Sequence, residues 1–433
     1  MRCGLDFGTS NTVLAVSDGG RPRLLPVDPV AGEVLPSVLY VRRDGSWIVG
    51  RGAIDTYLAD NAARGPIRRR AKLLGVRVAS SDPEQPIVEA HILADVDAPG
   101  RLFQSLKTFL GDPLLRATSV FGSPRDLSEL IAVLLSFVRE RARELTGALP
   151  AAVTLGRPVR FSGGPESEGL ALERLRTAAE LAGFREVHLE LEPVAAARAA
   201  RVAEGTSLVF DFGGGTLDLC LVRRRGDEVE ILSTGGCPVG GDRCTELLID
   251  EHVAPRLGSR AEWGPKRLRL PAYLVSTMRD WHALSALNEK PLLDALDDLV
   301  RAGAPRRELE ALRSAIELQL GYEIFATVDA TKCRLSAKRQ DLLTYHRAAV
   351  DLDALASRFR FEQLIGPLLR EADAALIETL SLAGVRADAV REVVCTGGSS
   401  AIPAARALLQ HRFPSARLRD ADPFTSVAAG LAL

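Results

Sequence analysis

Residues 206–222, TSLVFDFGGGTLDLCLV, decide the fold of this chain. An apolar run ends on Asp211, the glycines 213–215 follow, and Thr216 leads into a second apolar run that contains Asp218. Two apolar runs around a glycine-rich turn predict a β-hairpin, and the glycines permit positive φ or a close backbone approach to another group. Backbone N–H groups in such a turn form a nest for an anion, beside which Asp211 and Asp218 could hold a hydrated divalent cation. Most glycine turns bind nothing, so this hairpin alone is weak evidence.

The N-terminus repeats the same plan. Residues 1–17, MRCGLDFGTSNTVLAVS, run from a short apolar stretch through Asp6-Phe7-Gly8-Thr9-Ser10-Asn11 into a second apolar stretch. Both copies carry Asp-Phe-Gly with a hydroxyl residue close behind, between two apolar strands. Two similar phosphate loops far apart in one chain predict two halves that face each other across a cleft.

Composition supports a large chain with two lobes. Its 433 residues are too many for one ordinary domain, and 46% hydrophobic with 26% charged residues is typical of a soluble globular protein. The net charge of −1 gives no electrostatic reason to expect nucleic acid or an anionic membrane as a partner. We therefore expect neither.

The six cysteines lie mostly in or beside apolar runs, without C-x-x-C spacing. This pattern predicts buried, reduced thiols rather than a disulfide framework. Cys237, Cys244 and His252 could be imagined as metal ligands, but their spacing is not that of a tetrahedral site. The chain opens on a strand rather than a secretory signal, and its longest apolar run, residues 130–138, is too short to span a bilayer. We expect a monomer in a reducing cytoplasm.

Hydrophobic periodicity divides the chain into helices and strands. Residues 126–146 place their apolar side chains on one stripe and end before Gly147, which predicts a helix. Alternation of strands and helices, mixed with hairpins, indicates an α/β sheet covered by helices. Further helices are predicted at residues 52–61, 168–182, 245–256, 361–382, 404–413 and 425–431, and strands at 23–27, 37–43, 47–49, 87–94, 151–155, 187–191, 228–233 and 390–395.

Three regions remain. Residues 62–100 are predicted to be irregular apart from the strand at 87–94, and helical periodicity resumes over residues 102–110. Residues 258–325 are almost wholly helical in pattern. We expect this last region to form an enlarged outer subdomain.

Three other segments could belong to the same site. Glu192 precedes a proline at the first turn of an alanine-rich helix. Asp329, Lys332 and Ser336, spaced i, i+3 and i+7, share one helix face, although an exposed charged face is the plainer interpretation. The apolar strand that ends at residue 395 runs into TGGSS, where two glycines permit close approach by a flat ligand.

In this order the segments resemble the actin, sugar-kinase and heat-shock-protein-70 ATPase superfamily, and DFGTSN and VFDFGGGTLDLCLV are most similar to its DnaK-type chaperones. The resemblance implies an α/β fold of two lobes, each a mixed β-sheet flanked by helices, with a nucleotide cleft between them. It implies lobe I at residues 1–203, with an outer subdomain at about 37–115. Lobe II would span 204–420, with an enlarged helical outer subdomain at about 242–365, and residues 421–433 would form a helix that packs back on lobe I.

The resemblance also implies ATP or ADP and Mg²⁺ as cofactors. Asp6, Glu192, Asp211 and Asp218 would be the catalytic residues, with Asp6 and Asp211 holding Mg²⁺ through water. The residues implied to contact nucleotide are Gly8, Thr9, Ser10, Asn11, Gly213, Gly214, Gly215, Thr216, Gly240, Gly241, Asp329, Lys332, Ser336, Gly397, Gly398 and Ser399.

The chain departs from the family pattern at the catalytic lysine. Where the family keeps a lysine that contacts the γ-phosphate and the attacking water, the segment VGRGAI has Ile54. Lys72, Lys107 or Arg51 could supply the charge from a shifted position. The departure implies a slow ATPase.

Other departures concern the base and the lobe contact. The arginines that sandwich adenine in the family correspond to Cys333 and Ala401, and Phe424 replaces an acidic residue. These changes imply weaker adenine binding.

The resemblance leaves several functions open. The chain ends at Leu433, shortly after the ATPase-like lobes, which is similar to the short YegD-type members without a peptide-binding domain. A nucleotide-dependent switch read by an unknown protein partner or co-chaperone is the leading hypothesis. A phosphotransferase of the sugar- or acetate-kinase type and an actin-like filament protein are the alternatives.

Overall fold

The computed structural model describes residues 2–19, 21–63, 69–79, 87–95, 97–159, 161, 167–226, 228–285, 287–421 and 426–433. In strands β7 (Arg69–Ala79) and β8 (Ile87–Asp95), and at residues 282 and 285, only the backbone is described. The Lys72 side chain and Phe424 therefore lie outside the described part. No helix within it is long and apolar enough to cross a membrane.

One half of the molecule, lobe I, is built on a mixed sheet in the order β13-β12-β1-β2-β3. In it β1 is antiparallel to β2 and parallel to β12, and β12 is parallel to β13. Its strands are β1 (Arg2–Phe7), β2 (Asn11–Ser17), β3 (Arg23–Leu24), β4 (Leu35–Pro36), which pairs with β2, β12 (Ala152–Arg157) and β13 (Glu186–Leu191).

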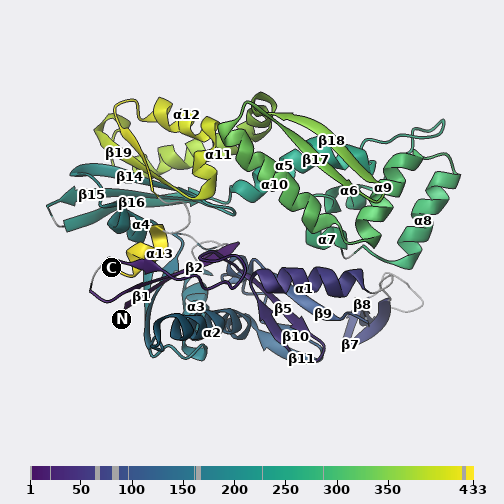
Figure 1. Cartoon of the computed structure of the whole chain (residues 1–433), viewed down its shortest axis with the longest axis horizontal. Coiled ribbons are helices and arrows are strands. Elements are labelled where there is room, and N and C mark those ends of the chain that lie inside the picture. The colour runs from purple at the N-terminus through teal and green to yellow at the C-terminus, as the bar shows by residue number, and fades with distance from the viewer. Residues whose placement is uncertain are drawn as a thin grey trace.

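The other half, lobe II, carries a sheet in the order β16-β15-β14-β19-β20. Its directions repeat those of the first sheet, because β14 is antiparallel to β15 and parallel to β19, and β19 is parallel to β20. Its strands are β14 (Gly205–Phe212), β15 (Leu217–Arg225), β16 (Glu228–Cys237), β19 (Val390–Thr396) and β20 (Arg417–Asp420). Figure 1 shows the two lobes one above the other.

Helices follow equivalent strands in the two lobes. In lobe I, α2 (Leu127–Thr146) precedes β12 and α3 (Glu168–Leu181) follows it, while in lobe II α11 (Arg358–Leu382) precedes β19 and α12 (Pro403–Arg412) follows it. The predicted helices in these four places are confirmed. The fold class implied by the resemblance, two lobes that each have a mixed sheet with helices, is likewise confirmed.

The ends of α2 show why this helix could be predicted. The side chain of Asp126 accepts from the backbone N–H of Glu129, whose carboxylate accepts from the N–H of Asp126, which completes a capping box. Gly147 ends the helix with φ of 76°, a conformation that glycine adopts without strain. Both signals are local in the sequence.

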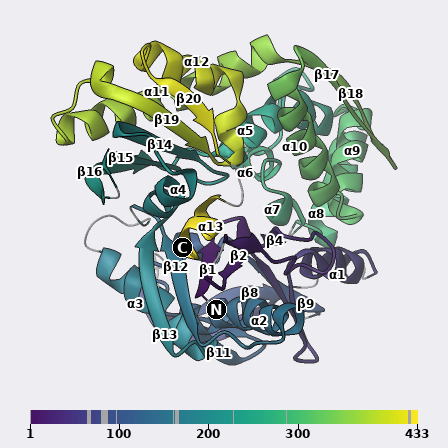
Figure 2. The same ribbon diagram turned by 60° about the vertical axis from the view of Figure 1, so that its left-hand side comes forward.

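Two helices lie between the sheets. The short helices α4 (Glu192–Ala200) and α13 (Ser426–Leu431) pack on each other, and α13 also contacts β1 and β2 (Figures 1 and 2). The contact leaves no room for side chains, since a Cβ on Gly430 would lie 1.8 Å from the carbonyl oxygen of Ala195. A Cβ on Gly4 would similarly lie 2.4 Å from that of Ala428. These two glycines let the C-terminal helix lie directly against α4 and β1.

Smaller elements extend each lobe outward. In lobe I they are a sheet of β5 (Val38–Arg42), β6 (Trp47–Val49) and β9 (Gly100–Gln104), the helix α1 (Arg51–Ala62), the 3₁₀ turn η1 (Leu106–Phe109), and the hairpins β7–β8 and β10 (Ala117–Val120)–β11 (Ser123–Asp126). In lobe II they are α5 (Gly241–Leu248), α6 (Ala272–Thr277), α7 (Trp281–Ser285), α8 (Lys290–Arg301), α9 (Arg306–Glu317), α10 (Gly321–Ala337) and the hairpin β17 (Gln340–Arg347)–β18 (Val350–Ser357). The predicted lobe and subdomain boundaries stay predictions.

The helix predicted over residues 102–110 is wrong. The segment forms the end of β9 and then η1. Its apolar residues fit a helix stripe, but Leu102 and Phe103 instead pair with β5, which is distant in sequence. Non-local strand pairing therefore overrode the local pattern.

Other predictions differ from the structure as well. The strand β7 lies in a region predicted to be irregular and pairs with β8, and the hairpin β17–β18 and strand β20 were not predicted. The helix predicted over 245–256 begins at Gly241 and changes into a π turn, Ile249–Val253, and a 3₁₀ turn, Ala254–Leu257. Residues 258–271 contain turns and a β-bridge rather than helix.

Candidate functional site

A cavity of about 380 Å³ lies between the two sheets. Both glycine-rich hairpins, the start of α4 and the loop after β19 line it. The predicted site residues that the structure brings together here are Asp6, Gly8, Thr9, Ser10, Asn11, Glu192, Asp211, Gly213, Gly214, Gly215, Thr216, Asp218, Gly397 and Gly398. We call this cavity the cleft.

The two hairpin loops are built alike. Phe7 pairs with Thr12, and Phe212 with Leu217, so four residues lie between the last paired residues of each hairpin. The N–H of Gly8 donates to the carbonyl of Asn11 at 2.8 Å, and the N–H of Gly213 to that of Thr216 at 3.0 Å. The repeat seen in the sequence is thus a structural repeat.

The loops also face each other. A Cβ on Gly214 would lie 3.2 Å from the hydroxyl of Ser10, and one on Gly215 3.6 Å from Thr9. The Ser10 hydroxyl donates to the carboxylate of Asp242 at 3.3 Å and so joins the first loop to α5 of lobe II. The two loops therefore lie close together and border the same cavity.

Asp6 and Asp211 occupy equivalent positions, one residue before the Phe of each loop. Burial, with the nearby Glu192 charge, raises the pKa of Asp6 to about 7, although Lys107 opposes this shift. Burial and the charge of Asp218 raise the pKa of Asp211 well above its usual range. Both carboxyl groups therefore lie where negative charge is poorly compensated by the protein.

Asp218 faces Asp211 across the second hairpin. Its carboxylate accepts from the Thr216 hydroxyl at 2.8 Å and from the N–H of Val159 at 3.4 Å. Burial and Glu192 still raise the pKa of Asp218, to about 6. Thr216 therefore fixes the orientation of this carboxylate.

Lys107 is the cation of the cleft. Its ammonium donates to the Glu192 carboxylate, and both side chains are buried. Burial alone would lower the pKa of Lys107, but the charges of Glu192, Asp6 and Asp218 outweigh it and raise the pKa. Within the described lining of the cleft, Lys107 is the only lysine or arginine.

The surroundings of Ile54 explain why its side chain is apolar. Ile54 lies on α1, 4% exposed, in an apolar cluster that includes Tyr40, Tyr57 and Trp281, and it does not line the cleft. Arg51, another candidate for the missing charge, pairs with Asp55 and Tyr322 instead. Of the two candidate cations whose side chains the structure describes, Lys107 is the one that lines the cleft, and the Lys72 side chain lies outside the described part.

A magnesium–phosphate group fits these residues. Asp6, Asp211, Asp218 and Glu192 supply hard oxygen donors, as Mg²⁺ requires, and Lys107 alone cannot neutralise them. The loop after β19 lies directly against the second hairpin, since a Cβ on Gly397 would lie 2.4 Å from the carbonyl of Phe212. We assign Asp6 and Asp211 as the residues that would hold the ion.

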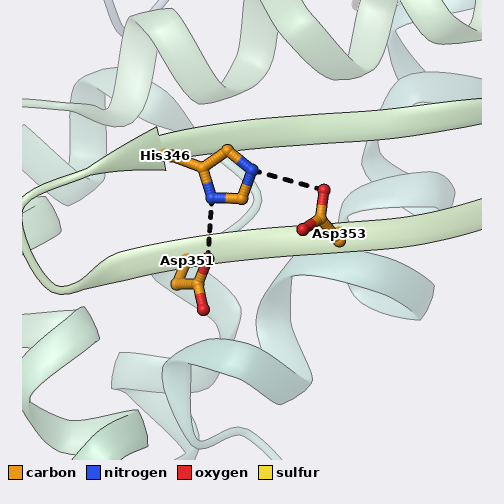
Figure 3. A group of neighbouring side chains, drawn as sticks. All are labelled: His346, Asp351 and Asp353. Atoms are coloured by element: carbon orange, nitrogen blue, oxygen red, sulfur yellow. Dashed lines mark hydrogen bonds and ion pairs between the residues drawn. The ribbon is translucent and has the colours of Figure 1, made fainter.

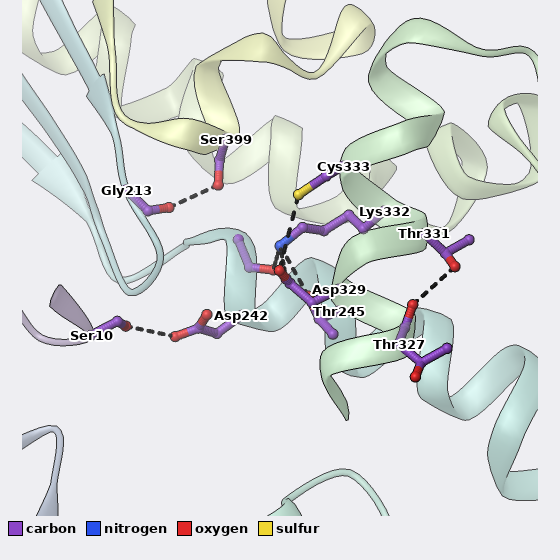
Figure 4. Close-up of polar contacts among 11 residues, drawn as sticks. Ser10, Gly213, Asp242, Thr245, Thr327, Asp329, Thr331, Lys332, Cys333 and Ser399 are labelled. Atoms are coloured by element: carbon purple, nitrogen blue, oxygen red, sulfur yellow. Dashed lines mark hydrogen bonds and ion pairs between the residues drawn. The ribbon is translucent and has the colours of Figure 1, made fainter. Parts of the chain in front are cut away.

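A polar cluster adjoins the cleft in lobe II (Figure 4). Lys332, on α10, donates to the Asp329 carboxylate at 2.6 Å, the Thr245 hydroxyl at 3.0 Å and the carbonyl of Gly241 at 3.1 Å. The Thr245 hydroxyl in turn donates to Asp329 at 2.9 Å. The predicted helix face of Asp329 and Lys332 is therefore tied to the start of α5.

The same cluster reaches the second phosphate loop. The Ser399 hydroxyl donates to the carbonyl of Gly213 at 2.9 Å, and the N–H of Gly241 donates to that carbonyl at 3.0 Å. A Cβ on Gly240 would lie 2.0 Å from the carbonyl of Gly214. Gly240, Gly241 and Ser399 thus support the loop, although they do not line the cleft itself.

The remaining predicted residues lie farther out. Ser336 is half-buried on α10, and its backbone carbonyl accepts from Arg358 at 3.2 Å. Cys333 and Ala401, which stand where the resemblance expects arginines, are exposed.

Asp242 and Thr245 were not predicted as site residues. Both lie in the first turns of α5, and the N–H of Asp242 donates to the carbonyl of Gly214 at 2.9 Å. Gly240 and Gly241 were the sequence signal that could have indicated these two residues, because the glycines lie between the end of a strand and the start of a helix. Lining residues such as Pro158 and Phe161 carried no such signal.

A separate group of His346, Asp351 and Asp353 lies on the exposed face of the β17–β18 hairpin (Figure 3). The ring Nδ1 lies 2.7 Å from Asp351, and Nε2 lies 3.3 Å from Asp353. Both ring nitrogens thus have carboxylate partners, and Arg307 also pairs with Asp351 at 2.6 Å. We interpret the group as a surface charge network rather than a metal site.

Comparisons with known proteins all find Hsp70-type chaperones. A family model described as Hsp70 protein matches residues 319–433, which begin just after α9 and include α10 and everything that follows it. Over 99% of its length the chain is 28% identical to a chaperone protein HscA homolog of Bordetella petrii and 27% identical to the chaperone protein HscA of Pectobacterium carotovorum. It is 25% identical, again over 99% of its length, to the chaperone protein DnaK of Thermus thermophilus.

These relatives are longer proteins. The chain covers 57% of the two HscA proteins and 60% of the DnaK protein. It therefore spans little more than half the length of the curated relatives it matches.

Proposed function

We propose that the chain, which is similar over 99% of its length to chaperones HscA and DnaK, is a heat-shock-protein-70 family member with the actin-like ATPase fold and binds Mg·ATP or Mg·ADP in the cleft. Nucleotide would close the two lobes, and hydrolysis would be slow, so that the protein acts mainly as a chaperone-related switch. The phosphates would lie against residues 8–10 and 213–216.

One observation carries this proposal. Two identically closed hairpin loops bring Asp6 and Asp211 into one cavity from opposite lobes. Backbone N–H groups suit phosphate oxygens, and paired carboxylates suit a hydrated divalent cation. A site divided in this way between two lobes binds best when the lobes approach each other.

The residues of the cleft suggest separate roles. Mg²⁺, when bound, would neutralise phosphate charge, which is the main need of phosphoryl transfer. Asp218, oriented by Thr216, and Glu192 would accept hydrogen bonds from the attacking water and so position it. Lys107 would place positive charge near the transferred group.

The contact between Lys107 and Glu192 supports slow hydrolysis. An ammonium already paired with one carboxylate and close to two more offers less of its charge to a phosphate. Complete removal of one preorganised donor lowers rates by about 10²–10³, which is the upper limit for a donor that is only weakened. We therefore propose a rate below that of a site with a freely available lysine.

Other properties are proposed on the same basis. The division into lobes at residues 203 and 420, the protein partner or co-chaperone, a monomeric state and a cytoplasmic location follow from the resemblance. The adenosine would lie beside Asp329, Lys332, Gly397 and Gly398.

Calorimetric titration tests the binding. We expect ATP and ADP to bind more tightly with Mg²⁺ than without it, and GTP to bind more weakly. No binding of any nucleotide at millimolar concentration would disprove the proposal. Single-turnover hydrolysis then measures the rate, while phosphate transfer to sugars or acetate, or nucleotide-dependent sedimentation, would favour the two alternative functions.

A further inference from the structure

A second cavity of about 350 Å³ lies in lobe I, outside the cleft. It is bounded by β9, η1, the segment before β10, and the first turns of α2. Most of its walls are apolar, and the innermost side chains, among them Leu102, Leu106 and Leu130, are buried. Its volume is within the range of about 300–1,000 Å³ that is usual for small-molecule sites.

The 3₁₀ turn η1 separates this cavity from the cleft. Leu106 and Phe109 line the second cavity, whereas Lys107 and Thr108 line the cleft. A 3₁₀ helix has three residues per turn, so residues i and i+3 share a side and the two between them face elsewhere. A group that displaces Leu106 and Phe109 must therefore move the backbone that carries Lys107.

Arg101 supplies a positive charge at the cavity. Its guanidinium lies 4.9 Å from the centre of the Phe103 ring and donates to the backbone carbonyl of Ser119. Among the described residues, no carboxylate forms an ion pair with Arg101. Arg101 is exposed to solvent, and partial burial of its guanidinium lowers its pKa.

The other charged residues of the cavity already have partners. Arg125 pairs with Glu129 at 3.2 Å, and the carboxylate of Asp112 accepts from the N–H of Leu114 at 2.8 Å. Arg101 is therefore the charge that a ligand would meet. Arginine binds carboxylates through two parallel hydrogen bonds, which makes a carboxylate the anion that best suits it.

We propose that this cavity binds an amphipathic carboxylate, a hydrocarbon chain or ring that ends in one carboxylate group. Its hydrocarbon part would lie against Leu106, Phe109 and Leu130, and its carboxylate would pair with Arg101. Occupancy would shift η1 and thereby change how Lys107 meets the nucleotide. Carboxylate binding is inferred from the cavity alone, whereas its effect on nucleotide rests on the proposed function.

Titration of the whole chain with decanoate, without nucleotide and below the concentration at which decanoate forms micelles, tests the binding. We expect saturable binding of one decanoate, weakened at least about tenfold by Arg101→Gln because the charge-assisted pair is lost. Arg116→Gln, an exposed arginine nearby that does not line the cavity, is the matched control and leaves the affinity unchanged. Decan-1-ol, which lacks the carboxylate, binds more weakly.

A second variant tests the position. Ala117 is exposed and lines the cavity, so Ala117→Phe fills the space without disturbing the core and abolishes binding. Thermal unfolding shows whether the Ala117→Phe variant is folded. If that variant does not fold, the Arg101→Gln variant alone tests whether decanoate binds in this cavity. Absent binding, binding unaffected by Arg101→Gln, or equal binding of decan-1-ol overturns the proposed ligand class.

The coupling is tested with nucleotide. Saturating decanoate is expected to change the affinity for Mg·ADP, or the single-turnover rate with ATP, by about fivefold or more, as is typical of coupled sites. Arg101→Gln removes the effect at the same decanoate concentration. Decanoate that binds without this effect overturns the coupling. A protein that binds decanoate but no nucleotide overturns the proposed function and the coupling, and leaves the binding site standing.

Discussion

Asp211 and Asp329 provide a contrast between two acidic residues of the proposed site. Asp211 would hold hydrated Mg²⁺, whereas Asp329 is already paired with Lys332 and would contact only the ribose. We expect Asp211→Asn to weaken Mg²⁺-dependent ADP binding by about 10–100-fold, since hydrogen bonds to charged groups contribute ~1.5–3 kcal/mol. Calorimetry with and without Mg²⁺ measures this. Asp329→Asn serves as the comparison, and equal losses in both variants would contradict the assignment.

Lys107 is the residue on which hydrolysis should depend most. Lys107→Met leaves Glu192, Asp6 and Asp218 without their cation, so we expect the single-turnover rate to fall by about 10²–10³. Lys338→Met, which removes an exposed lysine paired with Asp341, is the matched control and leaves the rate unchanged. A Lys107→Met variant that keeps its rate and binds ATP would show that another cation acts.

Ile54→Lys, which would restore the lysine of the family pattern, should not accelerate the reaction. The new ammonium would lie among Tyr40, Tyr57 and Trp281 rather than in the cleft. Burying an unpaired charge destabilises a protein. The apolar surroundings of Ile54 therefore argue that the missing lysine cannot be restored at this position.

At the scale of elements, an aromatic contact joins the lobes beyond the cleft. Trp281 of α7 lies between Tyr57 of α1, at 6.1 Å between ring centres, and Tyr322 of α10, at 5.1 Å. Because aromatic pairs contribute ~0.5–1.5 kcal/mol each beyond buried area, Trp281→Ala should speed ADP release by about tenfold. Stopped-flow displacement of a fluorescent ADP measures the rate. Trp47→Ala, within lobe I alone, should not change it.

The packing of α4 on α13 gives a prediction about stability. Gly430→Ala would drive a methyl group into the backbone of Ala195, and overpacking of this kind lowers the free energy of unfolding by about 1–3 kcal/mol. Gly169→Ala is the matched control, because α3 has open space there and alanine favours helix. Urea denaturation of both variants compares them, and a Gly430→Ala variant as stable as the wild type would contradict the close approach.

At the scale of the whole molecule, the carboxylates of the cleft predict a pH dependence. The pKa of Asp6 is raised to about 7 and that of Asp218 to about 6, so the folded state binds more protons than the unfolded state above pH ~4. Their contribution to stability is present at low pH and is lost as the pH rises through these values. Urea denaturation of the Mg²⁺-free protein between pH 5 and about 8 should reveal the loss, and Asp6→Asn should reduce it. A wild type and an Asp6→Asn variant with parallel pH profiles would contradict this origin.

The sequence alone determined the two hairpins, the residues of their loops and the main helices. These features rest on local signals: glycines in a turn, an acidic residue before them, a capping box and a final glycine at α2. A chain with such signals forms the same hairpin or helix wherever its partners lie. The cleft carboxylates Asp6, Asp211 and Asp218 could therefore be named in advance.

The tertiary structure alone decided which cation enters the cleft and what surrounds Ile54. Lys107 and Glu192 are far apart in sequence, and they meet because β9 pairs with β5 and ends at η1 beside the cleft. The same pairing turned a segment with helical periodicity into a strand. Contacts of this kind depend on long-range packing, which local sequence patterns do not encode, because the free energy of a strand pair or a buried ion pair is shared by residues that only the folded chain brings together.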